Sequence, residues 1–259
     1  MPLDRLSTLF ARFDLVAEPL PPARFGDGNL FLLATERENP PEGLLFWPDP
    51  DKRSTDLSDV DRSSIVLAAR IDLGAAARPL TASLPDRLYL DIAAAPQIQA
   101  LTTLMSGEAE VPRCGGGTAF TRLCEVLLIQ MLRHAIEHDL VRSGMLAGLA
   151  HPQLARAVVA LHDDPARAWN VEALAAQAGM SRSRFMATFQ QVMAETPMRY
   201  LKRWRMQAAR RDLSRGGRVG ATARRYGYAS AEAFSRAYLA FFGEAPSTAR
   251  RKMDGLPAS

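Results

Sequence analysis

The sequence predicts an α+β fold in which a strand-rich part comes first and a helical part follows. Residues 1–112 hold short apolar runs broken by proline and glycine, and from residue 118 onward apolar residues recur at helical spacing. The expected strands lie at 30–34, 43–47, 64–71 and 87–90. We therefore expect a β-rich domain with a helical segment over residues 1–165 and an all-helical domain over residues 166–259.

Polar and glycine-rich stretches separate the expected elements of the first domain. Residues 51–62 are polar and are expected to form a loop, and a helix is expected over residues 95–105. Gly115–Gly117 break the chain before a long helix over residues 118–140. Because this helix is broadly apolar, we expect it to pack on the sheet and to form a two-fold dimer contact. A short amphipathic helix is expected over residues 154–161.

The helical domain follows an expected hinge at 163–167 and carries several helix-start signals. Asn170 is a good N-cap, and Glu172 lies in a first turn, where the helix dipole favours negative charge. Thr196 precedes Pro197, and proline is favoured in the first position of a helix. The expected helices are 171–178, 182–192, 197–213, 218–226, 231–242 and 247–252.

One short pattern occurs twice in this domain, about 49 residues apart. Each copy, 174–185 and 222–234, has a short helix, a glycine, a turn, a serine, and an aromatic residue four positions after the serine. Glycine takes the positive φ of the turn, and serine accepts a bond from a free N–H of the second helix. The residues are Gly179, Ser181 and Phe185, then Gly227, Ser230 and Phe234. The pattern predicts two helix-turn-helix units, whose second helix fits the DNA major groove.

The helix expected at 197–213 joins the two units. It would span roughly 25 Å at the rise of an α-helix. A rigid connection of this length can hold two recognition helices about one DNA turn, ~34 Å, apart.

Charge is distributed unevenly along the chain. The net charge is +4, but residues 168–259 hold 16 Lys and Arg against 6 Asp and Glu. Residues 1–167 hold 16 basic and 22 acidic residues. A basic module joined to an acidic one is typical of a DNA-binding domain attached to a regulatory domain. Double-stranded promoter DNA is therefore the expected partner.

Composition indicates a globular protein of one or two domains, since 47% of its 259 residues are hydrophobic. No run of 18 or more apolar residues occurs, so no membrane span is expected. The first residues lack the basic and apolar pattern of a secretion signal. Two cysteines are too few for a disulfide framework in a chain of this size. We therefore expect a cytoplasmic protein.

Three stretches of the helical domain resemble the AraC/XylS transcriptional regulators. They are Gly179-Met180-Ser181, the linker with Pro197 to Leu201 and Trp204 to Met206, and Gly227-Tyr228 followed by Phe234 to Ala237 and Phe242 to Pro246. The likeness covers about 90 residues. It implies sequence-specific binding to promoters, and RNA polymerase becomes a candidate partner.

The first domain resembles the cupin-like sensory domain found in one branch of that family, in a degenerate form. This likeness lies in residues 44–48, 80–85 and 122–130. It implies that the domain binds a small-molecule effector or mediates homodimerisation. The alternative within the same class is a regulator that needs no ligand and uses this domain only to oligomerise.

Motif matching places the base-reading positions of the first recognition helix on Ser183, Met186 and Ala187. Met186 and Ala187 offer only apolar contact, for example to a thymine methyl group. Many relatives carry a basic residue where Ala187 stands, so we expect weak base readout here. Arg182 and Arg184 flank these positions and are expected to hold phosphates.

In the second recognition helix the matched positions are Ala231, Glu232 and Arg236. Arg236 has two donors that match guanine O6 and N7, so we expect it to be the main base reader. Glu232 can accept from cytosine N4 or interact with the helix dipole.

A cupin-like metalloenzyme with a helical appendage is the alternative from another class. The histidines all follow the expected sheet, at positions 134, 138, 151 and 162. His134 and His138 share a helix face, but no obvious third ligand follows. No phosphate-binding loop or Ser/His/Asp arrangement is recognisable. We therefore expect no catalysis, no metal and no cofactor.

Cys114 is a candidate redox sensor. It lies beside Arg113 and before a helix start, the electropositive kind of surroundings in which reactive cysteines are found. Cys124 falls in an apolar helix and is expected to be an inert core residue.

Overall fold

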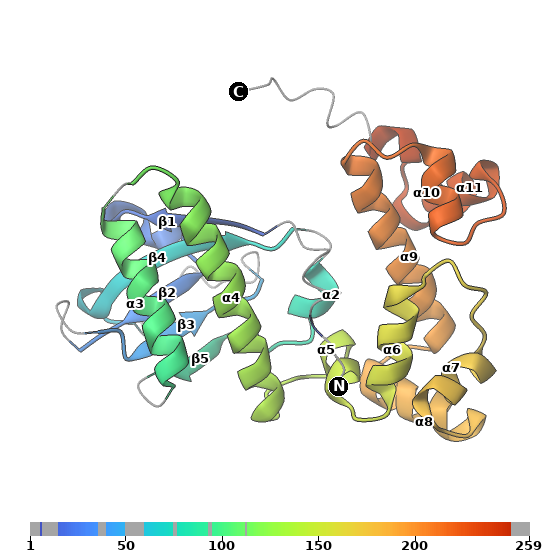
Figure 1. Ribbon diagram of the computed structural model, residues 1–259, viewed down its shortest axis with the longest axis horizontal. Helices are drawn as coiled ribbons and strands as arrows, with labels where there is room; N and C mark the ends of the chain where they lie inside the picture. Colours follow the sequence, from blue (N-terminus) through green and yellow to red (C-terminus); the bar gives the residue numbers. More distant parts are fainter. Residues whose placement is uncertain are drawn as a thin grey trace. The chain divides into compact units, whose positions relative to one another are not determined.

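The computed structural model of the protein describes residues 6, 15–35, 40–49, 60–74, 77–92, 95–111 and 113–249. The chain forms two compact units, one over Phe13–Arg142 and one that begins at Ser143. The first holds a sheet and two long helices, and the described part of the second is helical (Figure 1). The expected α+β fold class is confirmed.

Five antiparallel strands form the sheet of the first unit, in the order β1-β4-β2-β3-β5. Their bounds are β1 Val16–Leu20, β2 Leu30–Leu33, β3 Gly43–Phe46, β4 Ile65–Asp72 and β5 Leu88–Asp91. Leu20 pairs with Ala68, and Ala68 pairs with Phe31. Because paired residues point to the same face, these side chains meet there and cluster with Leu45 and Phe25.

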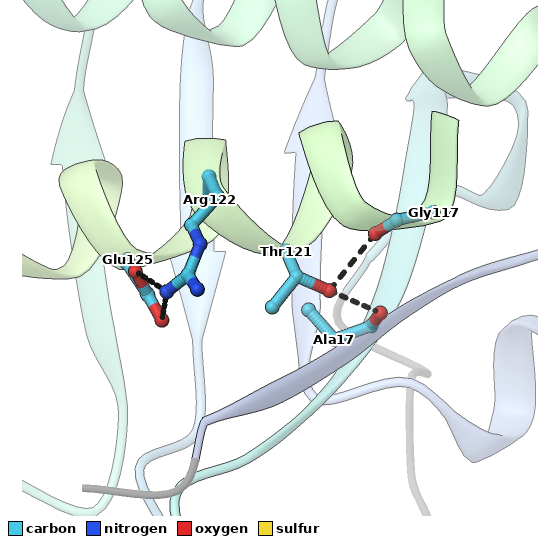
Figure 2. Close-up of polar contacts among 5 residues, drawn as sticks. All are labelled: Ala17, Gly117, Thr121, Arg122 and Glu125. Atoms are coloured by element: carbon cyan, nitrogen blue, oxygen red, sulfur yellow. Dashed lines mark hydrogen bonds and ion pairs between the residues drawn. The ribbon is translucent and has the colours of Figure 1, made fainter. Parts of the chain in front are cut away.

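Two long helices pack side by side against this sheet (Figure 1). The helices of the unit are η1 Pro22–Asp27, η3 Arg62–Ser64, α2 Arg78–Thr81, α3 Pro96–Glu110 and α4 Gly116–Glu137. Figure 2 shows the Thr121 hydroxyl of α4 donating to Gly117 O at 3.0 Å and to Ala17 O of β1 at 3.3 Å. An ion pair within α4, Arg122 to Glu125 at 2.7 Å, lies beside it. The hydroxyl thus ties α4 to the edge strand.

Helix α4 is buried along one broad face, on which its buried residues recur at helical spacing. Phe120, Leu127, Leu128 and Met131 are at most 1% exposed, whereas Val126 is 46% exposed. The expectation that this helix packs on the sheet is therefore confirmed.

The expected strands are confirmed, each within one residue at either end, but strand β1 was missed. Its run Val-Ala-Glu-Pro-Leu contains Pro19, which argues against a central strand yet is tolerated at the edge where β1 lies.

The expected break at Gly115–Gly117 is wrong in part. Gly115 has φ 80°, but Gly116 and Gly117 already belong to α4, because first-turn N–H groups need no partner within the helix. Arg62, the last residue of the expected loop, begins η3, and residues 51–59 lie outside the described residues.

The second unit consists of helices. They are α5 Met145–Ala150, α6 Leu154–Asp163, α7 Val171–Ala178, α8 Arg182–Met193, α9 Pro197–Ser214, α10 Val219–Arg225 and α11 Ala231–Phe242. Residues 246–249 are also helical, and the rest of the helix expected at 247–252 lies outside the described residues. No helix in the described part of the chain is long and apolar enough to cross a membrane.

Helix α5 was not expected from the sequence. It contacts both α8 and α6, so α5 and α6 belong to the second compact unit. The Gly144 N–H donates to Val192 O at the end of α8, at 2.9 Å. A side chain at Gly148 would meet Met193 Sδ at 2.1 Å, so α5 lies directly against α8. The compact units therefore divide between Arg142 and Ser143, whereas the functional division at 165/166 stays a prediction.

Candidate nucleic-acid interface

The first repeat of the sequence pattern forms a helix, a tight turn and a second helix. Gly179 ends α7 with φ 64°, and its N–H and that of Met180 bond to carbonyls of the last turn of α7 at 3.1 and 3.0 Å. This pair of backbone hydrogen bonds is the Schellman motif, with which many helices end at a glycine. The Ser181 hydroxyl then accepts from the N–H of Arg184 at 3.4 Å and caps α8. Phe185 is fully buried beneath the turn.

The second repeat folds in the same way. Gly227 has φ 77°, and its N–H and that of Tyr228 bond to carbonyls of α10 at 3.1 and 2.9 Å. The Ser230 hydroxyl accepts from the N–H of Ala233 at 3.1 Å and caps α11. Phe234 is fully buried. Both predicted helix-turn-helix units are thus present, with the predicted residue in each role.

An aromatic cluster holds α8 against α9 and α6. The rings of Phe185 and Phe189 lie 5.5 Å apart, and those of Phe189 and Tyr200 lie 5.9 Å apart. His162 Nε2 lies 2.7 Å from the Tyr200 hydroxyl, and its ring stacks on Trp204 at 3.7 Å. Burial raises the pKa of Tyr200. Sequence reasoning missed the role of His162, although its place on the apolar side of α6 is a readable signal.

The candidates on α8 form an exposed surface. Exposed are Arg182, Ser183, Arg184 and Ala187, and Met186 is half-buried. Arg182 Nε pairs with Glu172 of α7 at 2.7 Å, and Arg184 donates to Gln153 at 3.5 Å. Both arginines lie at the surface, so these exposed bonds can be exchanged for phosphate oxygens at little cost.

On α11, Glu232 and Arg236 are exposed and Ala231 is half-buried. Hydrogen bonds, chiefly from the Ser230 side chain and then from backbone N–H, lower the pKa of Glu232, with a smaller effect of Arg236. Glu232 therefore serves the start of its own helix. Within the residues that the structure describes, no ion pair holds Arg236.

Several other arginines of this unit are bonded to other residues of the protein. The Arg205 guanidinium binds two backbone carbonyls, of Pro165 and Arg167. Asp212 accepts from the Tyr226 hydroxyl at 3.0 Å. The remaining pairs are Arg203 with Glu195, Arg210 with Glu244 and Arg225 with Asp212. Sequence reasoning assigned no internal contact to these side chains.

Further basic residues are exposed on this unit and were not singled out from the sequence. They include Arg199, Lys202, Arg215, Arg218 and Arg224. Arg199 and Lys202 are three residues apart on α9 and share a helix face. This helical spacing could have identified Arg199 and Lys202 from the sequence.

The other candidate residues lie in the first unit. Cys114 is exposed and Cys124 is buried, and burial raises the pKa of Cys124 to about 12. The His134 and His138 rings stack at 3.9 Å. Within the described residues, no group of three or more His, Cys, Asp or Glu is placed to hold a metal ion.

The first unit also has a cavity of about 540 Å³ where β1 meets η1 and α3. Its walls are mostly apolar, with Ser106 and Glu110 of α3 as the polar side chains. The pairing of β1 with β4 ends at Leu20 and Ala68, so β4 residues 65–67 border the cavity beyond the end of β1.

Two families match the chain, one in each unit. The family described as "Helix-turn-helix domain" matches residues 174–252, and the family described as "Cupin" matches residues 26–137.

Proteins with related sequences are transcriptional regulators. An uncharacterized HTH-type transcriptional regulator of Haemophilus influenzae is 34% identical over 175 residues, covering 67% of this chain and 58% of that protein. A putative AraC-like transcription regulator of Streptomyces lividans is 40% identical over 139 residues, covering 51% and 46%. The RCS-specific HTH-type transcriptional activator RclR of Escherichia coli is 28% identical over 217 residues, covering 80% and 75%. The chain spans about half the length of the first two relatives.

Two helix-turn-helix units joined by one long helix, after a cupin-like unit, define the class of double helix-turn-helix proteins. The chain belongs to the AraC-type family of transcriptional regulators, as its sequence motifs indicate.

Proposed function

We propose that the protein binds double-stranded promoter DNA sequence-specifically and regulates transcription. The observation that carries this proposal is the pair of helix-turn-helix units in one compact unit, each with an exposed face on its second helix. Helix α9, which joins them, has 18 residues and is about 27 Å long. That length suits two recognition helices in successive major grooves, which lie ~34 Å apart.

The individual residues divide between base readout and phosphate contact. Arg236 reads guanine through its two donors, and Arg182 and Arg184 hold phosphates. Ser183, Met186 and Ala187 make short-range contacts that discriminate bases weakly. Ala231 allows close approach of α11, and Glu232 mainly supports the start of α11.

Selection of binding sites from random duplexes by the full-length protein tests this function. The expected motif has two half-sites about one helical turn apart. Arg122→Ala, which removes an exposed arginine from α4 of the other unit, should select the same motif. Absence of any enriched sequence would refute the proposal.

The cavity of the first unit is the proposed effector site. About 540 Å³ is within the size range of small-molecule sites. Its apolar walls and the Glu110 carboxylate suit an amphipathic molecule with an apolar body and a cationic or donor group. Octylamine should then stabilise the protein against heat more than octanoate does, and Ala109→Trp, which fills the cavity, should remove this effect. Equal effects of both probes would contradict the proposal.

A homodimer in the cytoplasm that contacts RNA polymerase fits this function. The outer side of α3 and α4 is the proposed dimer surface, since Leu104 is 61% exposed and Val126 is 46% exposed there. Exposed apolar side chains on adjacent helices are suited to a self-complementary contact. Redox sensing by Cys114 stays a prediction.

A further inference from the structure

Arg205 on the linker helix α9 binds the loop between α6 and α7. Its Nε donates to Pro165 O at 2.6 Å, and its Nη2 donates to Arg167 O at 2.8 Å. The side chain is partly buried, and this burial lowers the pKa of Arg205. A guanidinium presents donors in a rigid fork, so two carbonyls at once fix its orientation.

The turn of the second helix-turn-helix unit touches the same loop. A Cβ on Gly227 would lie 2.6 Å from Ala166 O and 3.1 Å from Arg205 Nη2. Gly227 also has φ 77°, which disfavours any side chain. The backbone of this turn is therefore in direct contact with the loop, and α11 begins at Ala231, just after it.

The loop itself is held in one conformation by its own side chains. Trp169 Nε1 donates to Asp164 O at 2.8 Å, and the Arg167 N–H donates to the Asp164 carboxylate at 3.2 Å. The Arg167 guanidinium lies 4.2 Å from the centre of the Trp169 ring. The loop leads directly into Asn170, the N-cap of α7. It is thus a rigid extension of the first helix-turn-helix unit.

These contacts connect the first helix-turn-helix unit to the second. Each helix-turn-helix unit also packs on α9, the first through α8 and the second through α10. The junction of Pro165–Arg167, Arg205 and Gly227 adds a second connection that does not pass along α9. A rotation of one helix-turn-helix unit about the axis of α9 must therefore break the junction.

We propose that this junction sets the angle between the two recognition helices and thereby the number of base pairs between the two half-sites. The inference rests on the proposed DNA-binding function. Each base pair adds ~3.4 Å along the duplex, so a small rotation of one unit changes the preferred spacing. Arg205 is a positioning residue that acts through the loop and touches no base.

The first test measures binding to duplexes whose half-sites are moved one or two base pairs closer or farther apart. The wild type should lose about tenfold in affinity per displaced base pair, and Arg205→Met should vary by only about twofold across the series. Base preference within each half-site should stay unchanged. Lys202→Met removes an exposed charge from the same helix and should keep the wild-type spacing profile. An unchanged spacing profile in a folded Arg205→Met protein overturns the proposal.

The second test needs no DNA, so it separates failure of the junction from failure of the proposed function. Spin labels on Ala187→Cys and Ala240→Cys report the distance between the exposed faces of α8 and α11. Cys114→Ser removes the exposed native thiol, and Cys124 is buried with a pKa of about 12. The distance distribution should be narrow in the parent and broad or shifted in Arg205→Met. Where that variant does not fold, Arg205→Lys keeps the charge and loses the fork. Identical distributions in parent and folded variant overturn the proposal.

Discussion

Arginine side chains of the second unit differ in what already holds them. Arg225 is bound to Asp212 at 2.8 Å, and Arg205 to two carbonyls, whereas no ion pair among the described residues engages Arg236. The half-buried Arg205 must give up both carbonyl bonds before it reaches DNA, whereas the exposed Arg225 can exchange its carboxylate partner for a phosphate at little cost. Neighbouring residues, more than residue type, therefore decide which arginines are available.

Arg236→Ala should lower affinity by about 1–3 kcal/mol and relax the preference at one base pair, most simply a guanine. Arg184→Ala removes a phosphate contact, so it should weaken binding to all DNA sequences alike. The slope of log K against log salt should become shallower by about one. Site selection and salt titration of both variants side by side check these roles. If Arg236→Ala keeps the parent's base preference while Arg184→Ala changes it, the roles are reversed.

Among the elements, α5 and α6 form part of the helical unit that carries the recognition helices. Leu154, Val158 and Leu161 of α6 are at most 1% exposed, and each would cost about 1.5–3 kcal/mol to expose. A fragment of residues 143–259 should therefore fold and bind the selected DNA, and a fragment of residues 168–259 should not fold stably. Circular dichroism melts and binding assays on both fragments measure this. Equal stability of the two would show that α5 and α6 are dispensable.

Two adjacent residues of α4 allow folding and dimerisation to be tested separately. Leu127 is fully buried and Val126 is 46% exposed. Leu127→Glu should lose folding, because it buries an unpaired charge, whereas Val126→Glu should stay folded and become monomeric. Sedimentation velocity at micromolar concentration, with a thermal melt of each variant, tests the pair. A wild-type protein that sediments as a monomer would rule out the proposed dimer.

At the level of the whole molecule, basic charge is concentrated in residues 168–259, which hold 16 Lys and Arg against 6 Asp and Glu. Some of this charge is neutralised internally, as in the pair Arg210–Glu244 at 3.0 Å, so fewer side chains can meet phosphates. With four to six phosphates neutralised, log K should fall with log salt with a slope of about −4 to −5. Titration with the selected duplex between low and physiological salt measures the slope. A slope near zero would contradict a phosphate-based interface.

Local signals accounted for the helix-turn-helix units and for most element bounds. Asn170 caps α7 through a 2.8 Å bond, and both turn glycines adopt positive φ. These properties depend on residues only a few positions apart, so a sequence pattern can predict them. Strand β1 was not predictable in this way, because Pro19 argues against a strand and only the pairing with β4 shows that β1 is an edge strand, where proline is tolerated.

The sequence by itself determined most of the elements, the family, and the positions of the two recognition helices. Only the tertiary structure decided which arginines are free, where the compact units divide, and what buries His162 and Arg205. Arg205 meets Pro165 and Arg167, and Gly227 meets Ala166, across tens of residues of chain. Contacts of this kind leave no periodic trace in the sequence, because they depend on how separately formed helices pack together.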